Sequence, residues 1–319
     1  MPGMVTLAEF EAAADLVHAA MPPTPAYRWP LLCDRVGAEV WVKHENHTPL
    51  GAFKIRGGIV YMTELRREHP HLAGVVAATR GNHGQSVAFA ARRVGLTATI
   101  VVPHGNSVEK NAAMRALGAT LIEHGHDFQA ALEYAGDFAQ ERALHAMPSF
   151  DRRLVLGVAS YGLELFRAVP DLDTVYVPIG LGSGICGTMA ARDALGLKTK
   201  IVGVVAEGAP AYALSFAAKK PVSTNSAETM ADGVACRVPN EEALALILKG
   251  VERVVTVGES EIKNAMRALF TDTHNLAEGA GAAALAALLK ERESMADKRV
   301  AVIQTGGNID REVYLRAIA

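Results

Sequence analysis

Short apolar runs that end in a turn and lead into a helical segment recur along the whole chain. This alternation limits the possible folds more than any other feature. The apolar runs predict strands at 39–44, 74–79, 97–103, 119–123, 174–179, 201–206 and 299–304. The remaining periodic segments predict helices at 7–20, 55–68, 86–94, 107–117, 127–144, 157–168, 187–195, 240–249, 259–270 and 277–290. Because parallel strands need long, usually helical crossovers, the pattern predicts an α/β fold with parallel sheets.

Composition and charge limit the class of protein further. The 319 residues are 50% hydrophobic and 21% charged, which is ordinary for a globular enzyme. A net charge of -2 gives no reason to expect nucleic acid or an anionic membrane as a partner, and no apolar stretch reaches the length of a membrane span. The three cysteines are widely spaced, so we expect neither a disulfide framework nor a zinc site, and a cytoplasmic location. The first twenty residues lack the pattern of a signal peptide.

One lysine stands in an unusual setting. Lys54 lies between Phe53 and Ile55, with Gly51 shortly before it and a Gly-Gly pair at 57–58. Most lysines are exposed among polar residues, because the ammonium group is strongly hydrated. Apolar surroundings would lower the pKa of Lys54 and leave some free amine near neutral pH, as a Schiff-base lysine requires. Taken alone, the stretch favours a lysine that opens a helix and keeps its charge in water.

The strongest local motif is the glycine loop at 177–187, which lies between a predicted strand and a predicted helix. Glycines let the backbone approach an anion, so the loop predicts a phosphate site more strongly than a structural turn. Gly182, Gly184 and Gly187 match the dinucleotide fingerprint, and Glu207 follows twenty residues later, at the place of a ribose-binding acid. This motif alone predicts a nicotinamide-dependent dehydrogenase.

The rest of the chain separates the two phosphate hypotheses. A dehydrogenase would leave Lys54, the loop at 80–85 and the turn at 305–308 without a role. All three lie next to predicted strand ends, where α/β sheets bind ligands. A phosphate loop, a desolvated lysine and two polar glycine turns together favour pyridoxal 5′-phosphate as the cofactor.

Six stretches carry a more specific resemblance. They are GAFKIRGG (51–58), GNHGQ (81–85), VPIGLGSG (177–184), ADGV (231–234), AEGAGAAA (277–284) and TGGNID (305–310). With these stretches, in this order and over nearly its whole length, the chain resembles the fold-type II pyridoxal-phosphate enzymes. The branch it resembles is that of threonine/serine dehydratases and serine racemases. The resemblance implies a tryptophan synthase β-like architecture, with two open, twisted parallel-sheet domains and the cofactor in the cleft between them.

The resemblance also implies roles for individual residues. Lys54 would carry the cofactor as a Schiff base, Asn82 would bind its 3-hydroxyl, and Thr305 would face the pyridine nitrogen. Glu278 would lie near the ring or, equally well, cap its helix. The full implied cofactor set is Phe53, Lys54, Asn82, Gly180, Leu181, Gly182, Ser183, Gly184, Gly233, Glu278 and Thr305. The implied substrate-binding set is the turn Thr79, Arg80, Gly81, Asn82 and His83.

Three positions depart from the family pattern. Arg80 stands where serine racemases have a serine that works as acid and base on the face opposite the lysine. Thr305 replaces the usual serine or cysteine and adds a methyl group. The divalent-metal site of some relatives would align with Glu207, Ala211 and Ala213, so its second carboxylate is missing and we predict no metal.

The implied reaction is the β-elimination of a β-hydroxy amino acid to a 2-oxo acid and ammonia. Threonine, serine, a phenylserine and a hydroxyaspartate share the reacting atoms, and the sequence does not choose among them. An amino-acid racemase on the same scaffold is the alternative, and the dehydrogenase is a distant third. We expect a large domain of residues 1–71 and 149–319, a small inserted domain of residues 72–148, and a homodimer as in the family.

Overall fold

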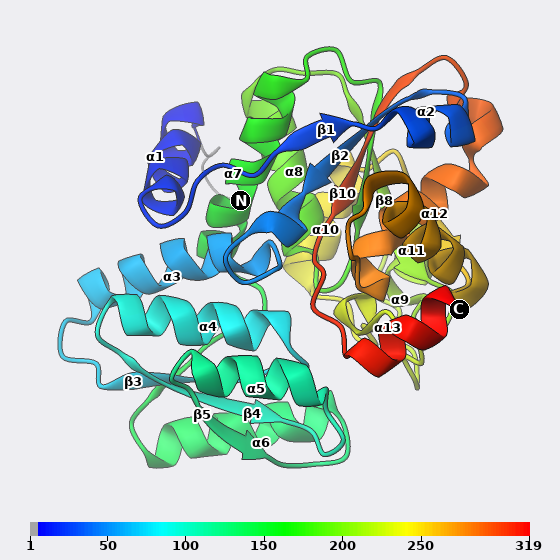
Figure 1. The fold of residues 1–319 in the computed structure, drawn as a ribbon. Helices are drawn as coiled ribbons and strands as arrows, with labels where there is room; N and C mark the ends of the chain where they lie inside the picture. Colours follow the sequence, from blue (N-terminus) through cyan, green and yellow to red (C-terminus); the bar gives the residue numbers. More distant parts are fainter. Residues whose placement is uncertain (1–5) are drawn as a thin grey trace.

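Two β-sheets organise the computed structural model, which describes residues 6–319 (Figure 1). The larger sheet has six strands in the order β1-β2-β10-β7-β8-β9. Its strands are β1 (Ala26–Arg28), β2 (Glu39–His44), β10 (Arg299–Gln304), β7 (Thr174–Pro178), β8 (Lys200–Ala206) and β9 (Arg253–Val257). Only the edge strand β1 pairs antiparallel, and the other pairs are parallel, so the predicted α/β fold with parallel sheets is confirmed.

The smaller sheet has four parallel strands in the order β5-β4-β3-β6. They are β5 (Thr120–Glu123), β4 (Thr97–Val102), β3 (Gly74–Ala78) and β6 (His145–Ala146). All four come from one continuous part of the chain, which lies inside the segment 72–148 that we predict as the inserted domain. The domain boundaries themselves stay a prediction.

Helices supply the connections between the strands. The α-helices are α1 (Leu7–His18), α2 (Pro30–Val36), α3 (Lys54–Glu68), α4 (Asn82–Arg93), α5 (Val108–Ala116), α6 (Phe128–Glu141), α7 (Arg152–Ala168), α8 (Ser183–Ala194), α9 (Ala211–Ala218), α10 (Glu241–Gly250), α11 (Glu259–Thr273), α12 (Gly279–Lys290) and α13 (Arg311–Ile318). Short 3-10 turns are η1 (Glu45–His47), η2 (Asp232–Val234) and η3 (Arg292–Met295). No helix of residues 6–319 is long and apolar enough to span a bilayer.

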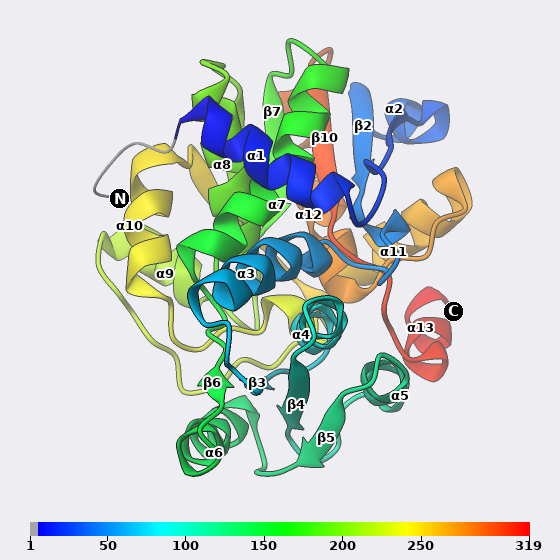
Figure 2. The same ribbon diagram turned by 90° about the vertical axis from the view of Figure 1, so that its left-hand side faces the viewer.

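Both faces of the larger sheet are covered, as expected for parallel strands. One face packs against α2, α11, α12 and α13, whose apolar side chains form a continuous core with residues of β2, β8 and β10. The other face packs against α1, α7, α8 and α10, and Figure 2 shows α1 and α7 in front of the sheet. The Ala-rich α12 fits close to the strands because its side chains are small.

The smaller sheet is covered by α3, α4 and α5 on one face and by α6 on the other. Helix α3 takes part in two cores. Tyr61, Met62 and Leu65 near its end pack on the smaller sheet, whereas Ile55 and Ile59 near its start pack against α1. This helix therefore lies between the half of the molecule built on the larger sheet and the half built on the smaller sheet (Figure 1).

Three helices begin at least four residues earlier than the sequence pattern predicts. Helix α4 begins at Asn82 instead of 86, because the Thr79 hydroxyl accepts hydrogen bonds from the N–H groups of Gly81 and Gly84 and so closes the turn. Helix α8 begins at Ser183 instead of 187, because Gly182 takes a left-handed φ of 104° that ends the loop directly before it. Helix α7 also begins early, at Arg152.

The two halves are joined by a pair of helix ends that cap each other. The Asp310 carboxylate, at the start of α13, accepts hydrogen bonds from the Ser107 hydroxyl and from the N–H groups of Val108 (3.3 Å) and Glu109 (3.1 Å) at the start of α5. In return, the Glu109 carboxylate accepts a hydrogen bond from the N–H of Arg311 at 2.9 Å. Each carboxylate thus satisfies N–H groups that its partner helix leaves free.

Candidate active site

The carboxyl ends of the parallel strands bring the predicted site residues together. Strand β2 leads through η1 to Lys54, and its neighbour β10 leads to Thr305. The two loops are tied to each other, because the N–H of Phe53 donates to the carbonyl of Thr305 at 3.0 Å and Ala52 pairs with Gly306. The lysine loop and the C-terminal glycine turn therefore form one unit.

Lys54 lies in surroundings that favour a free amine. Its side chain is half-buried, and its Nζ donates to the Ser183 Oγ at 3.2 Å. The same Nζ lies 4.8 Å from the centre of the Phe53 ring. Burial lowers the pKa of Lys54 to about 8, as the apolar neighbours in the sequence lead one to expect.

The contact with Ser183 places Lys54 beside the glycine loop. This loop follows β7 and passes directly into α8, whose first residues are buried. No side chain of residues 6–319 caps α8. A buried helix end with free N–H groups needs an acceptor, and the positive end of the helix dipole favours an anion there.

Close packing explains two of the loop glycines. A Cβ on Gly180 would lie 2.4 Å from the carbonyl oxygen of Gly233, so the loop packs directly on the backbone of η2. A Cβ on Gly182 would lie 2.7 Å from the Cβ of Ala243. Leu181, which stands between these glycines, is fixed by the Tyr212 hydroxyl, which donates to its carbonyl at 3.0 Å.

The start of α4 is a second helix end of the site, and the Thr79 hydroxyl closes part of it by accepting a hydrogen bond from the N–H of Gly84. Thr79 is buried and organises the turn. Arg80 is exposed and makes no hydrogen bond or ion pair within residues 6–319. His83 is half-buried, and its Nε2 atom is buried without a hydrogen-bond partner among the described residues. Burial lowers the pKa of His83 to about 3, and the charge of Lys54 adds to this shift, so the imidazole is neutral.

Asn82 is held by side chains from both sides. Its Nδ2 donates to the Glu278 carboxylate at 2.6 Å, and its Oδ1 accepts a hydrogen bond from the Asn308 Nδ2 at 2.8 Å. Glu278 occupies the N-cap position of α12 but makes no capping hydrogen bond with its side chain. The carboxylate therefore points to Asn82 instead of closing its own helix.

The sequence analysis missed Lys110, which stands in the first turn of α5. Its Nζ donates to Asp232 at 2.7 Å and to Glu278 at 3.1 Å. Its stem lies so close to Gly81 that a Cβ there would come within 2.3 Å of the Lys110 Cδ. The one signal in the sequence is position, because α5 follows the carboxyl end of β4 as α4 follows that of β3.

The structure joins most of the predicted residues but not all of them. Direct contacts link Lys54 with Ser183, Asn82 with Glu278, and Gly180 with Gly233. Thr305 is buried at the end of β10, and its hydroxyl makes no hydrogen bond within residues 6–319. Arg80 contacts none of the other predicted residues through a polar bond.

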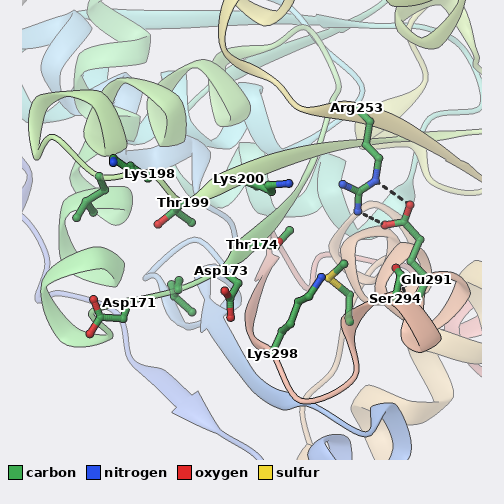
Figure 3. A pocket seen from close by; sticks show the side chains of 13 residues that line it. Asp171, Asp173, Thr174, Lys198, Thr199, Lys200, Arg253, Glu291, Ser294 and Lys298 are labelled. Carbon is green, nitrogen blue, oxygen red and sulfur yellow. Dashed lines mark hydrogen bonds and ion pairs between the residues drawn. The ribbon is translucent and has the colours of Figure 1, made fainter.

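A groove of about 550 Å³ lies at the opposite end of the larger sheet, where its strands begin (Figure 3). Thr174 and Lys200 line it, and Arg253 and Glu291 form an ion pair across part of it. The site residues follow the carboxyl ends of these strands, so this groove is separate from the candidate site. No cluster of metal-ligating side chains occurs in the part of the chain that the structure describes.

Comparison with known proteins gives a consistent result. The profile of the family described as pyridoxal-phosphate dependent enzyme matches residues 17–306. The chain is 34% identical to the L-threonine ammonia-lyase of Thermotoga maritima over 319 residues, which cover 99% of this chain and 78% of the relative.

Solved structures agree with the sequence comparison. A pyridoxal 5′-phosphate-dependent aspartate racemase superposes with a TM-score of 0.92 at 28% identity, over 98% of both chains. Threonine deaminase isoform 2 of Solanum lycopersicum superposes with a TM-score of 0.89 at 28% identity, over 99% of this chain and 94% of that one.

Proposed function

The chain belongs to the family of pyridoxal-phosphate dependent enzymes, and we propose that it catalyses the β-elimination of a β-hydroxy amino acid. The substrate loses water, and hydrolysis then returns one water, so the net products are a 2-oxo acid and ammonia. The observation that carries this proposal is the 34% identity to an L-threonine ammonia-lyase along 99% of the chain. The convergence of Lys54 and the glycine loop supports it.

The residues present fit pyridoxal phosphate. The buried, uncapped end of α8 offers N–H groups that suit a phosphate, and the Nε2 of His83 is a buried polar atom that has no partner in the described chain. Lys54, with a lowered pKa, supplies the amine. When bound, the cofactor supplies an electron sink that makes the α-proton of an amino acid removable.

Each group of the site has a proposed task. The N–H groups of 180–184 would hold the phosphate, Asn82 would bind the 3-oxygen, and the Thr305 hydroxyl would face the ring nitrogen. The first N–H groups of α4 that the Thr79 hydroxyl leaves free would bind the substrate carboxylate. Lys54 would take the proton from the substrate Cα. A neutral hydroxyl at Thr305 would place no negative charge beside the ring nitrogen, which would favour elimination of the β-hydroxyl.

An amino-acid racemase is the second candidate, because the aspartate racemase superposes closely. Racemisation needs a second group that gives a proton to the face opposite Lys54. Arg80 stands at the place in the turn where serine racemases have their acid/base serine. An arginine stays charged at any relevant pH, so Arg80 cannot cycle a proton. Its fork can instead pair with a substrate carboxylate. These properties favour elimination over racemisation.

Incubation of the purified protein with threonine, serine, phenylserine and hydroxyaspartate tests the proposal. We expect at least one of them to release 2-oxo acid and ammonia, with no racemisation of the remaining substrate. Arg80→Ala should raise KM more than it lowers kcat, because it removes a binding contact. Rapid racemisation by the parent protein, without 2-oxo acid, would overturn the assignment in favour of the racemase.

The proposal extends to the organisation of the protein. We assign residues 72–148 to a small domain that closes over the cofactor, which the separate four-stranded sheet supports. A homodimer in the cytoplasm fits the family and the three free cysteines, Cys33, Cys186 and Cys236. Analytical ultracentrifugation of the purified protein tests the dimer.

A further inference from the structure

Lys110 is the buried cation of a charged cluster that also holds the buried Glu278 and the partly exposed Asp232, and that joins the two halves of the molecule. Its side chain is 5% exposed and lies between the carboxylates of Asp232, from η2, and Glu278, from α12. Burial opposes the charge of Lys110, but Glu278 and Asp232 outweigh that effect and hold its pKa above the ordinary value. A buried cation held in this way costs desolvation, so it needs its two partners to stay charged.

The position of Lys110 is fixed by the start of α5. The Ser107 hydroxyl accepts a hydrogen bond from the N–H of Lys110 at 3.1 Å, and Asp310 holds the two N–H groups before it. The stem of Lys110 packs against Gly81, the residue before Asn82. The ammonium group is therefore held in place by contacts that lie outside the charged cluster itself.

Glu278 connects Lys110 to Asn82, because its carboxylate accepts a hydrogen bond from each of them. Because Glu278 accepts from Nδ2 and Asn308 donates to Oδ1, the amide of Asn82 has one allowed orientation. One hydrogen of Nδ2 stays free for a ligand in that orientation. A protonated Glu278 could donate instead of accept, and the amide could then turn its oxygen toward it.

Glu278 therefore has to remain a carboxylate, although it is 2% exposed. The charged groups that face it are Lys110 from α5 and Asp232 from η2, whereas α4 presents the uncharged amide of Asn82 and the turn after β10 presents the backbone of Gly306. Burial raises the pKa of Glu278, Lys110 opposes this rise and Asp232 adds to it. Lys110 is the one cation that faces this carboxylate within the described chain.

We propose that Lys110 is a positioning residue for the cofactor site, which keeps Glu278 ionised and thereby fixes the Asn82 amide with its N–H toward the cofactor. The inference rests on the function proposed above for the choice of ligand. The charge relation between Lys110 and Glu278 can be tested without that ligand.

The test compares Lys110→Met, Lys110→Arg, Glu278→Gln and the double variant K110M/E278Q. Methionine keeps the stem that covers Gly81 and removes only the charge. We expect Lys110→Met to weaken binding of pyridoxal 5′-phosphate by at least about tenfold, since breaking a buried pair costs more than about 1.4 kcal/mol. Lys110→Arg should keep most of the affinity. In the double variant the amide oxygen introduced by E278Q still accepts from Asn82 and leaves no buried carboxylate without its cation, so affinity should recover relative to Lys110→Met.

Unfolding measured against pH gives the second readout. In Lys110→Met the folded-state pKa of Glu278 rises further above its unfolded value of about 4.3. The unfolding temperature of this variant, relative to the parent, should therefore fall as pH rises above that value. K110M/E278Q should lack this pH dependence. Lys200→Met, which removes an exposed lysine paired with Glu252 at the far edge of the sheet, is the matched control and should behave as the parent does.

The outcomes separate the two proposals. A double variant no better than Lys110→Met in both readouts would mean that the charge of Lys110 does not act through Glu278, and it would overturn the positioning role. Lys110→Met with the affinity and pH profile of the parent would do the same. If even the parent fails to bind pyridoxal phosphate, the proposed function fails, while the pH dependence of unfolding still decides the relation between Lys110 and Glu278.

Discussion

At the scale of single residues, the lowered pKa of Lys54 has a direct consequence for cofactor capture. Only the unprotonated amine reacts with an aldehyde, and burial puts the pKa at about 8. The rate at which cofactor-free protein captures pyridoxal phosphate should rise with pH up to about 8 and then level off. An ordinary lysine would continue to gain up to about 10.4. Stopped-flow absorbance at a series of pH values measures this profile.

Borohydride reduction of the loaded protein identifies the lysine that reacted. The pyridoxyl group should be recovered on the peptide that contains Lys54, and Lys54→Ala should develop no visible band. Two results would remove Lys54 from its proposed role. One is a label on another lysine, and the other is a capture rate that still climbs above about pH 9, as expected for an exposed amine.

Thr305 offers a second test at this scale. Its hydroxyl is neutral and its residue is buried at the end of β10. Thr305→Ser keeps the hydroxyl and loses one methyl group, so kcat/KM should change by no more than about fourfold. Thr305→Asp would favour a protonated ring nitrogen and a longer-lived carbanion, and it should slow elimination by at least about tenfold. Steady-state assays of 2-oxo acid release compare the two, and an aspartate variant as active as the parent would contradict this view of the ring nitrogen.

Sequence reasoning identified the residues whose signal is local. Lys54 stood out because its neighbours in the chain are also its neighbours in space, as the Phe53 ring beside its Nζ illustrates. Lys110 could not be found in this way, since its partners Asp232 and Glu278 are more than a hundred positions away. Nothing in the segment around Lys110 marks it as different from a surface lysine of a helix.

At the scale of elements, the packing of the glycine loop on η2 predicts the effect of one added methyl group. A Cβ at Gly180 would meet the backbone oxygen of Gly233 at 2.4 Å, and a backbone atom cannot step aside as a flexible side chain can. Gly180→Ala should therefore displace the loop and weaken pyridoxal phosphate binding by at least about tenfold. Equilibrium dialysis measures the affinity.

Gly136 in α6 is the matched control, because a Cβ there would meet no atom within 4 Å. Gly136→Ala should leave cofactor binding unchanged and stabilise the helix by up to about 1 kcal/mol. Equal losses of affinity in both variants would mean that the contact between Gly180 and Gly233 has no special part in the site.

The elements that the sequence pattern missed share a physical reason. They are β1, β6, β9, α2, α9 and α13, which are short or lie at an edge. Strand β9, for example, is only partly buried, so its sequence lacks the continuous apolar run of the central strands. Helix α9 reads as apolar without a clear polar face. Tertiary contacts, and not local pattern, decide such segments.

At the scale of the whole molecule, the sequence predicted parallel sheets but not the order of their strands. The last strand of the chain, β10, inserts between β2 and β7 in the middle of the larger sheet. The pairing of β10 with β2 joins segments more than 250 positions apart, such as Arg299 with Glu39. Their complementarity depends on register and side-chain packing, which a single sequence does not reveal. The same insertion brings the turn that holds Thr305 next to the lysine loop.

The mutual capping of α5 and α13 has a consequence for local unfolding of the molecule. A helix end that relies on a distant partner loses its protection when that partner detaches, so the first amides of both helices should exchange with deuterium as one opening unit. Asp310→Ala should speed exchange at Val108 and Glu109 by about tenfold, the equivalent of one lost cap. Helix α6, whose cap Asp127 lies in its own turn, should keep its rate. If exchange at α5 is unchanged in Asp310→Ala, the C-terminal helix α13 does not govern the stability of the half that holds the smaller sheet.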